Sequence, residues 1–91
     1  MSQSRKVPTH RLQSNLVEAQ RWLASGQPAF ANTLLQPVLD DLQLRPEALY
    51  LSAVAALMDK RVEAALRCAR AAVAARPDVA RYAFVMGRHG R

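Results

Sequence analysis

Apolar residues recur at three- and four-residue steps near the start of the chain, between Arg11 and Ser25. They are Leu12, Leu16, Ala19, Trp22 and Leu23. This spacing places them on one face of a helix. The stretch Ser25-Gly26-Gln27-Pro28 follows, with a glycine that can end a helix and a proline suited to the first turn of the next. The pattern predicts a helix that begins near Thr9 or His10 and ends in a tight turn.

A second helix is predicted from Pro28 to Leu44. Its inward positions are expected to be Phe30, Leu34, Leu35, Val38, Leu39 and Leu42. Pro37 lies inside this segment. Because a proline within a helix removes one hydrogen bond and clashes with the preceding turn, we expect a kink or short break between Thr33 and Gln36.

The segment from Glu47 to Met58 is apolar nearly all round, and a helix without a polar face must be covered on most sides. We expect it to be the central helix. After a polar turn at residues 59–61, a fourth helix is predicted to about Arg76, with inward positions at Val62, Ala65, Leu66, Ala69, Ala72 and Val73. A fifth helix is predicted over about Val79 to Arg88. The predicted fold class is therefore all-α, with about five helices.

The chain contains an internal repeat. The separation along the sequence between Ala19 and Ala53 recurs in three other pairs of similar residues. They are Ala53 and Gly87, Leu23 and Leu57, and Ala31 and Ala65. We call this separation the repeat length. Small residues at helix crossings let two antiparallel helices approach closely. The positions of these pairs, more than their number, indicate a repeated structural unit.

In these positions the chain resembles the tetratricopeptide repeat family, whose motif has small residues at the helix crossing and a proline at the end of the unit. The clearest copy, residues 46–79, carries Leu49, Ala53, Ala56, Ala65, Ala69, Ala72 and Pro77. Residues 12–45 are a looser copy with Ala19, Trp22, Gly26, Ala31 and Leu35. Met86-Gly87 matches the first half of a third copy in residues 80–91. The departures from the motif are Asn15, Glu18, Pro37 and Gln43.

Residues 1–10 are polar and basic, which predicts a flexible tail. For residues 11–91 the resemblance implies antiparallel helical hairpins stacked as a short superhelix. It also implies a module that binds another protein, as an adaptor, a chaperone-like subunit or the N-terminal domain of a larger protein. Self-association into a homo-oligomer is a further expectation, because so few repeats limit the stacking between neighbours.

In such a stack the first helix of each pair lines a concave groove. The residues predicted to line it are apolar apart from one glutamine: Leu16, Gln20, Leu23, Tyr50, Val54, Leu57 and Met58. An apolar groove suits a partner's amphipathic helix or extended hydrophobic segment. The N-terminal helix or a second copy of the chain is the alternative occupant.

The net charge is +6, from 13 Lys and Arg against 7 Asp and Glu. The fourth helix and the turn before it carry Lys60, Arg61, Arg67 and Arg70 on one outer face. Such a face makes nucleic acid the alternative partner, because it can follow a row of phosphates. No aromatic residues alternate with the arginines for base stacking, so a solvated face is the preferred interpretation.

The sequence predicts neither an enzyme nor a cofactor or metal site. His10 and His89 stand in the terminal segments without metal-ligand partners at helical spacing, and the adjacent Asp40 and Asp41 point in different directions along a helix. Cys68, the only cysteine, is expected to be a small core residue. The lone cysteine and the lack of a signal-peptide pattern favour a cytoplasmic location, and no apolar segment is long enough to span a membrane.

Overall fold

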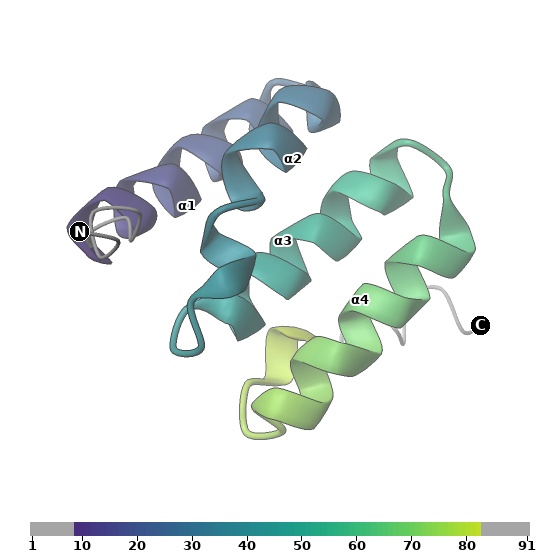
Figure 1. The fold of residues 1–91 in the computed structure, drawn as a ribbon. Coiled ribbons are helices and arrows are strands. Elements are labelled where there is room, and N and C mark those ends of the chain that lie inside the picture. Colours follow the sequence, from purple (N-terminus) through teal and green to yellow (C-terminus); the bar gives the residue numbers. More distant parts are fainter. Residues whose placement is uncertain (1–8, 83–91) are drawn as a thin grey trace.

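The computed structural model describes residues 9–82 of the 91-residue chain. Within this range every regular element is helical: α1 (Thr9–Ala24), α2 (Pro28–Leu35), the short 3-10 helix η2 (Val38–Asp40), α3 (Arg45–Met58) and α4 (Val62–Ala75). Helices α1 and α2 form one antiparallel hairpin, and α3 and α4 form a second beside it (Figure 1). The predicted all-α fold class is confirmed for this part of the chain.

The two ends of the chain are described only in part. Of the predicted tail, residues 1–10, the last two residues already belong to α1, and the others lie outside the described residues. Helical backbone begins again at Ala80 and reaches Tyr82, the last described residue. The rest of the predicted fifth helix, and with it most of the half repeat 80–91, lies outside the described range.

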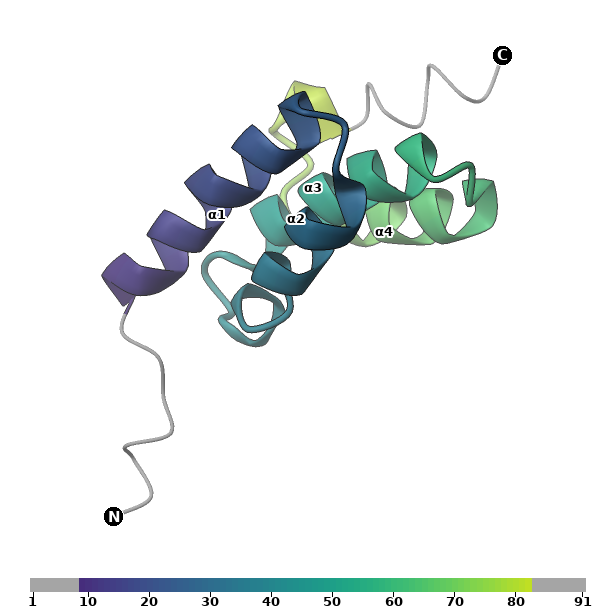
Figure 2. The ribbon, with the colours of Figure 1, turned by 90° about the horizontal axis from the view of Figure 1, so that it is seen from above.

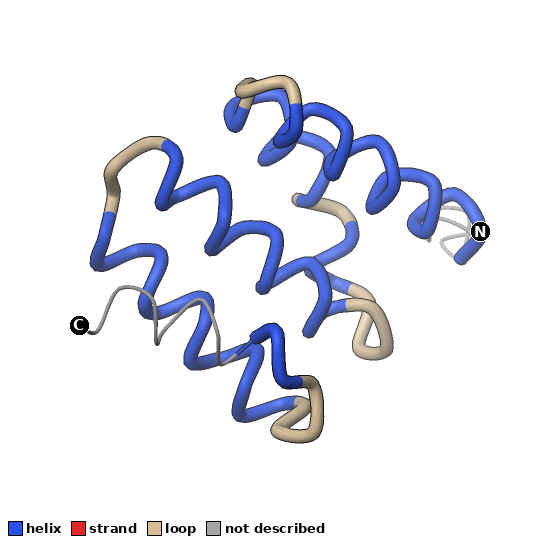
Figure 3. The backbone as a smooth tube through the Cα atoms, turned by 180° about the vertical axis from the view of Figure 1, so that it is seen from behind, coloured by secondary structure: helices blue, strands red, loops and turns tan. Residues whose placement is uncertain are grey.

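The same kind of turn joins the two helices of each hairpin (Figure 3). After α1, Gly26 has a φ of 79°, its N–H donates to Leu23, and the next N–H donates to Trp22. After α3, Lys60 has a φ of 63° and makes the equivalent bonds with its successor. Both are Schellman turns, in which a left-handed residue closes the helix. Gly26 and Lys60 are one repeat length apart, so the sequence repeat is also a repeat of turn geometry.

Pro37 divides the second predicted helix as expected. Helix α2 ends at Leu35, and the chain continues into η2 only after the proline. Asn15 of α1 donates from its side-chain amide to the carbonyl of Leu34 at 3.0 Å, and thus supplies a donor in the last turn of the shortened helix. The departure from the repeat motif at position 15 is therefore linked to the departure at position 37.

The expected continuation of this helix to Leu44 is wrong. The side chain of Asp41 accepts hydrogen bonds from the backbone N–H groups of Gln43 at 2.9 Å and Leu44 at 3.2 Å, which turns the chain toward α3. Leu42, predicted to face inward, is therefore 78 % exposed. Phe30 is also exposed, and it stacks on Trp22 with ring centroids 4.8 Å apart instead of entering the core.

Helix α3 is the central element, as its apolar sequence predicts. It packs against α1, α2, η2 and α4 (Figure 2). Ala48, Leu51 and Ala55 of α3 belong to a core cluster with residues of α1 and α2. Ala53 of α3 packs with Ala69 of α4 in a second cluster. The core of the described chain is therefore continuous across both hairpins through this one helix.

Alanines are fully buried at equivalent positions of the two hairpins. Ala19 and Ala31 in the first hairpin, and Ala53 and Ala65 in the second, are at most 1 % exposed. With no side chain beyond Cβ, they let the helix backbones approach closely. The expectation that alanines one repeat length apart share a packing role is confirmed for these four positions.

Replacement of Ala53 by leucine should destabilise the protein, because a larger side chain forces the helices apart. Overpacking of this kind costs about 1–3 kcal/mol. The matched control is Ala74→Leu on the exposed side of α4, which should change the free energy of unfolding by no more than about 0.5 kcal/mol. Urea unfolding followed by far-ultraviolet circular dichroism measures both. Equal stability of the two variants would contradict the close-contact role of Ala53.

Candidate functional site

The residues predicted to line a groove divide into two groups. Leu16 and Leu23 on α1 are each 8 % exposed and belong to the core cluster that α2 and α3 complete, while Gln20 between them is exposed. This side of the predicted groove therefore presents a polar side chain and little of either leucine. The apolar surface that the structure shows is narrower than the predicted groove and lies on α3.

On α3 the predicted residues share a side of the helix and remain partly open. Tyr50, Val54 and Leu57 are half-buried against Ala53 and Ala69, and Met58 is 40 % exposed. We call Tyr50, Val54, Leu57 and Met58 the α3 face. It is the one part of the predicted groove where apolar side chains are both held in place and accessible.

The repeat explains why the α1 and α3 residues differ in burial. Leu16 and Leu23 stand one repeat length before Tyr50 and Leu57. In the first hairpin these positions are buried in a cluster to which the next helix, α3, contributes Ala48, Leu51 and Ala55. Among the described residues after α4, only Ala80–Tyr82 are helical, so no described segment forms a full helix of this kind over the α3 face.

The opposite end of the stack is polar. The α1 positions one repeat length before Ala48, Leu51 and Ala55 are Ser14, Val17 and Arg21, and all three are exposed. Together with His10, Gln13 and Glu18 they border a shallow hollow on the outer side of α1. A polar outer face is typical of the repeat that ends a stack. The two ends of this molecule are therefore different surfaces.

A cluster of polar side chains beside the α3 face connects the last described residues to the first turn of α3. Arg81 forms an ion pair with Glu47, and the Tyr82 hydroxyl donates to the same carboxylate at 2.9 Å. The ring centroids of Tyr50 and Tyr82 lie 5.3 Å apart, and the Arg81 guanidinium lies 5.5 Å from the first and 5.6 Å from the second. Sequence reasoning missed this cluster, although Glu47 and Arg81 are separated by one repeat length.

The environment of Tyr82 strongly raises the pKa of its phenol. Burial of the side chain and its hydrogen bond to Glu47 raise the pKa of Tyr82 from 10.0 to about 12, against a smaller opposing effect of Arg81. The folded protein therefore holds the phenolic proton more tightly than the unfolded chain does.

Alkaline pH should weaken the attachment of Tyr82. Its contribution to stability is complete below pH 10.0 and is lost as the pH rises through about 12, because the folded state has the higher pKa. Tyr82→Phe lacks the titrating group, so the difference in unfolding free energy between wild type and this variant should shrink over the same interval. Urea unfolding at a series of alkaline pH values measures it. A constant difference across that interval would contradict the assignment.

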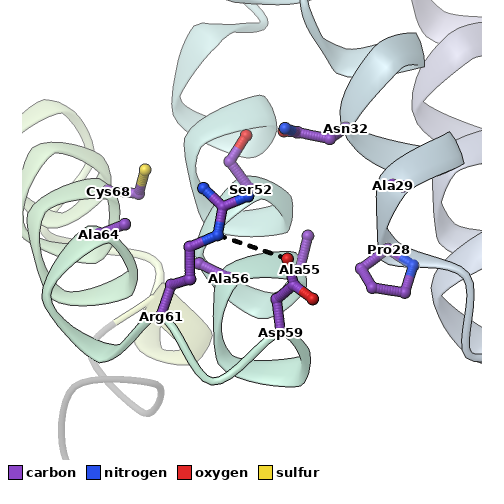
Figure 4. A pocket seen from close by; sticks show the side chains of 10 residues that line it. All are labelled: Pro28, Ala29, Asn32, Ser52, Ala55, Ala56, Asp59, Arg61, Ala64 and Cys68. Atoms are coloured by element: carbon purple, nitrogen blue, oxygen red, sulfur yellow. Dashed lines mark ion pairs between the residues drawn. The ribbon is translucent and has the colours of Figure 1, made fainter.

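A second hollow, of about 260 Å³, lies away from the α3 face, between α2, α3 and α4 (Figure 4). Four of its ten lining residues are alanines, and the pair Arg61–Asp59, at 3.4 Å, borders it. The buried hydroxyl of Ser52 lines it and finds no hydrogen-bond partner among the described residues. Its two charged lining residues, Arg61 and Asp59, are paired with each other.

Cys68 lines the same hollow and is half-buried. Burial raises the pKa of its thiol, and the positive charge of Arg67 offsets this only in part. Because the thiolate is the reactive form, the structure indicates an unreactive side chain.

Cys68 should therefore react more slowly with an aromatic disulfide reagent in the folded protein than in the unfolded chain. The reaction should also accelerate as the pH approaches the raised pKa. Since the chain has a single cysteine, absorbance kinetics report on this residue alone, and the same protein in concentrated urea is the control. A folded-state rate equal to the urea rate would contradict the protection of this thiol by burial.

The predicted basic patch is exposed but is not a continuous row of free cations. Lys60 lies in the turn after α3, Arg61 pairs with Asp59, and Arg67 and Arg70 project from α4. Residues 9–82 contain nine of the 13 basic residues and all seven acidic residues. Most of the excess positive charge therefore belongs to the terminal segments.

Other candidate chemistry finds no support in the described range. His10 is exposed on α1, His89 lies outside the range, and Asp41 is used as a turn cap. No three His, Cys, Asp or Glu side chains of residues 9–82 converge on one point as metal ligands would. None of the described helices combines the length and apolarity needed to cross a membrane.

Comparisons of the chain with protein-family models, with curated proteins and with solved structures gave no match. The resemblance to the tetratricopeptide repeat therefore stays a prediction.

Proposed function

We propose that the chain is a protein-interaction module that binds an amphipathic helix of a partner protein through the α3 face. The observation that carries this proposal is the difference between equivalent positions of the two hairpins. Leu16 and Leu23 are buried where a further helix packs beside them, whereas Tyr50 and Leu57 are half-open. The α3 face thus has the composition of a helix-packing surface and remains accessible.

The form of this face favours a helix as the occupant. Tyr50, Val54, Leu57 and Met58 follow one another at three- and four-residue steps along α3. A partner helix laid alongside can match that spacing with apolar residues of its own. Tyr50 is suited to be an anchor, because aromatic side chains contribute much of the binding energy at protein interfaces.

The charges around the face argue against an acidic peptide as the ligand. Arg81, whose guanidinium lies 5.5 Å from the centre of the Tyr50 ring, is already paired with Glu47. A basic clamp for a carboxylate needs cations that are free to bind it. Binding should therefore depend on apolar contact, with a minor contribution from charge.

Met58→Asp should abolish partner binding, because it places a charge on the exposed part of the α3 face without entering the core. Val17→Asp is the matched control: Val17 is also apolar and exposed, but it lies at the polar end of the stack. Capture from cell lysate on the tagged proteins, quantified by mass spectrometry, compares the two with wild type. Loss of a captured protein with Met58→Asp and its retention with Val17→Asp supports the proposal, whereas equal capture by both variants contradicts it.

A salt titration distinguishes this function from nucleic-acid binding. Apolar binding changes little with salt, whereas a protein that neutralises several phosphates loses about 10³–10⁵ in affinity between low and physiological salt. A labelled single-stranded oligonucleotide should show no steep, salt-dependent binding. If it does, and if Arg67→Ala with Arg70→Ala abolishes it, the basic patch is the functional surface.

A further inference from the structure

Two exposed aromatic side chains stand together on the first hairpin and have no aromatic counterparts on the second. Trp22 of α1 and Phe30 of α2 are 36 % and 56 % exposed, and their rings stack with centroids 4.8 Å apart. One repeat length later the chain has Ala56 and Ala64. Both alanines line the hollow between α2, α3 and α4 (Figure 4). The first hairpin therefore carries an exposed aromatic pair at the positions where the second hairpin is hollowed.

The hollow has the size and the chemistry to receive an aromatic side chain from outside. Its volume of about 260 Å³ is below the roughly 300–1,000 Å³ of pockets that enclose whole small-molecule ligands. Ala29 and Asn32 in its walls are exposed, so it opens at the surface. The buried hydroxyl of Ser52 has no hydrogen-bond partner among residues 9–82, and a buried polar group without a partner is rare. The indole N–H of Trp22 is the kind of donor that this hydroxyl can accept.

Helix α2, which separates the hollow from the aromatic pair, carries no charge. Helices α1, α3 and α4 each contain acidic and basic residues, whereas α2 has neither. The hydroxyl of Thr33, on its exposed side, donates to the carbonyl of Ala29 within the helix at 3.2 Å. Charged residues are depleted at the centres of protein interfaces. In a twofold contact the same surface meets itself, so an uncharged helix can pair without opposing like charges. Among the described helices, α2 is therefore the one best suited to face a second copy of itself.

We propose that two copies of the chain associate about a twofold axis along the exposed side of α2, and that the Trp22–Phe30 pair of each copy enters the hollow of the other. Phe30 faces α1, whereas Ala29 and Asn32 face the hollow, so the pair and the hollow lie on opposite sides of α2 at the same level. A half-turn about an axis parallel to α2 exchanges these two sides. It brings each aromatic pair over the hollow of the other copy, and the closed contact gives a dimer and not a filament.

Sedimentation of the full chain over a range of concentrations tests the association. The mass should rise toward twice that of one chain as the concentration increases. Phe30→Asp places a charge on the aromatic pair, and Ala64→Phe fills the hollow from within, so each should keep the protein monomeric. Val17→Asp and Ala74→Phe, at exposed positions of α1 and α4, are the controls for the added charge and the added ring. Both controls should associate as the wild type does.

A mixture of the two monomeric variants tests whether the contact is exchanged between copies. Phe30→Asp keeps an open hollow and Ala64→Phe keeps the aromatic pair, so one dimer of the two retains one of the two contacts. The mixture should associate more than either variant does alone and less than the wild type. A mixture that stays monomeric while the wild type dimerises would contradict the exchange.

The fluorescence of Trp22 reports the same event, because it is the only tryptophan in the chain. Its emission should move to shorter wavelength as the wild-type protein is concentrated, since the ring leaves water. The emission of Ala64→Phe should not change with concentration. A wavelength that is independent of concentration in a dimerising wild type would overturn the placement of Trp22 in the contact.

Three further results would overturn the proposal. They are a wild type that stays monomeric, assemblies larger than a dimer, and a dimer that persists in both variants with native far-ultraviolet circular dichroism. Loss of the dimer with Met58→Asp and not with Phe30→Asp would assign the association to the α3 face instead. This proposal does not rest on the proposed function, and the capture experiment tests the α3 face separately, so either can fail without the other.

Discussion

Close approach of helix backbones at alanine is the constraint on which the rest of this structure depends. Ala19, Ala31, Ala53 and Ala65 are all buried, and each contributes little apolar area itself. By leaving no side chain beyond Cβ, they allow neighbouring larger residues such as Leu35 and Val38 to become fully buried. The hairpins are alike because both use this contact and because both close with the same left-handed turn, at Gly26 and at Lys60.

The elements that depend on local chemistry could be predicted from the sequence. Gly26 and Pro28 fix the first turn, and Pro37 stops α2, whatever lies around them. The end of the second predicted helix could not be predicted from the periodicity of apolar residues, although its cause is also local. Leu42 is exposed because Asp41 caps a turn before it, and a helical pattern of apolar residues does not contain that information.

The candidate site shows the same division. The spacing of Tyr50, Val54 and Leu57 identifies a face of α3, but the same reasoning gave Leu16 and Leu23 an equal role on α1. Sequence periodicity says which residues share a side of a helix, and it does not say which side the next hairpin will cover. The contacts of Glu47 with Tyr82 were missed for the same reason, since they join residues far apart in the chain.

The two outer surfaces of the pair of hairpins differ in polarity: the outer side of α1 is polar, and the α3 face is apolar. A helix placed against Ser14, Val17 and Arg21 would have to desolvate a serine and an arginine for one valine. A helix placed against Tyr50, Val54 and Leu57 would cover apolar carbon that already rests on Ala53 and Ala69. An additional helix would therefore bury more apolar area at the α3 face than at the surface formed by Ser14, Val17 and Arg21.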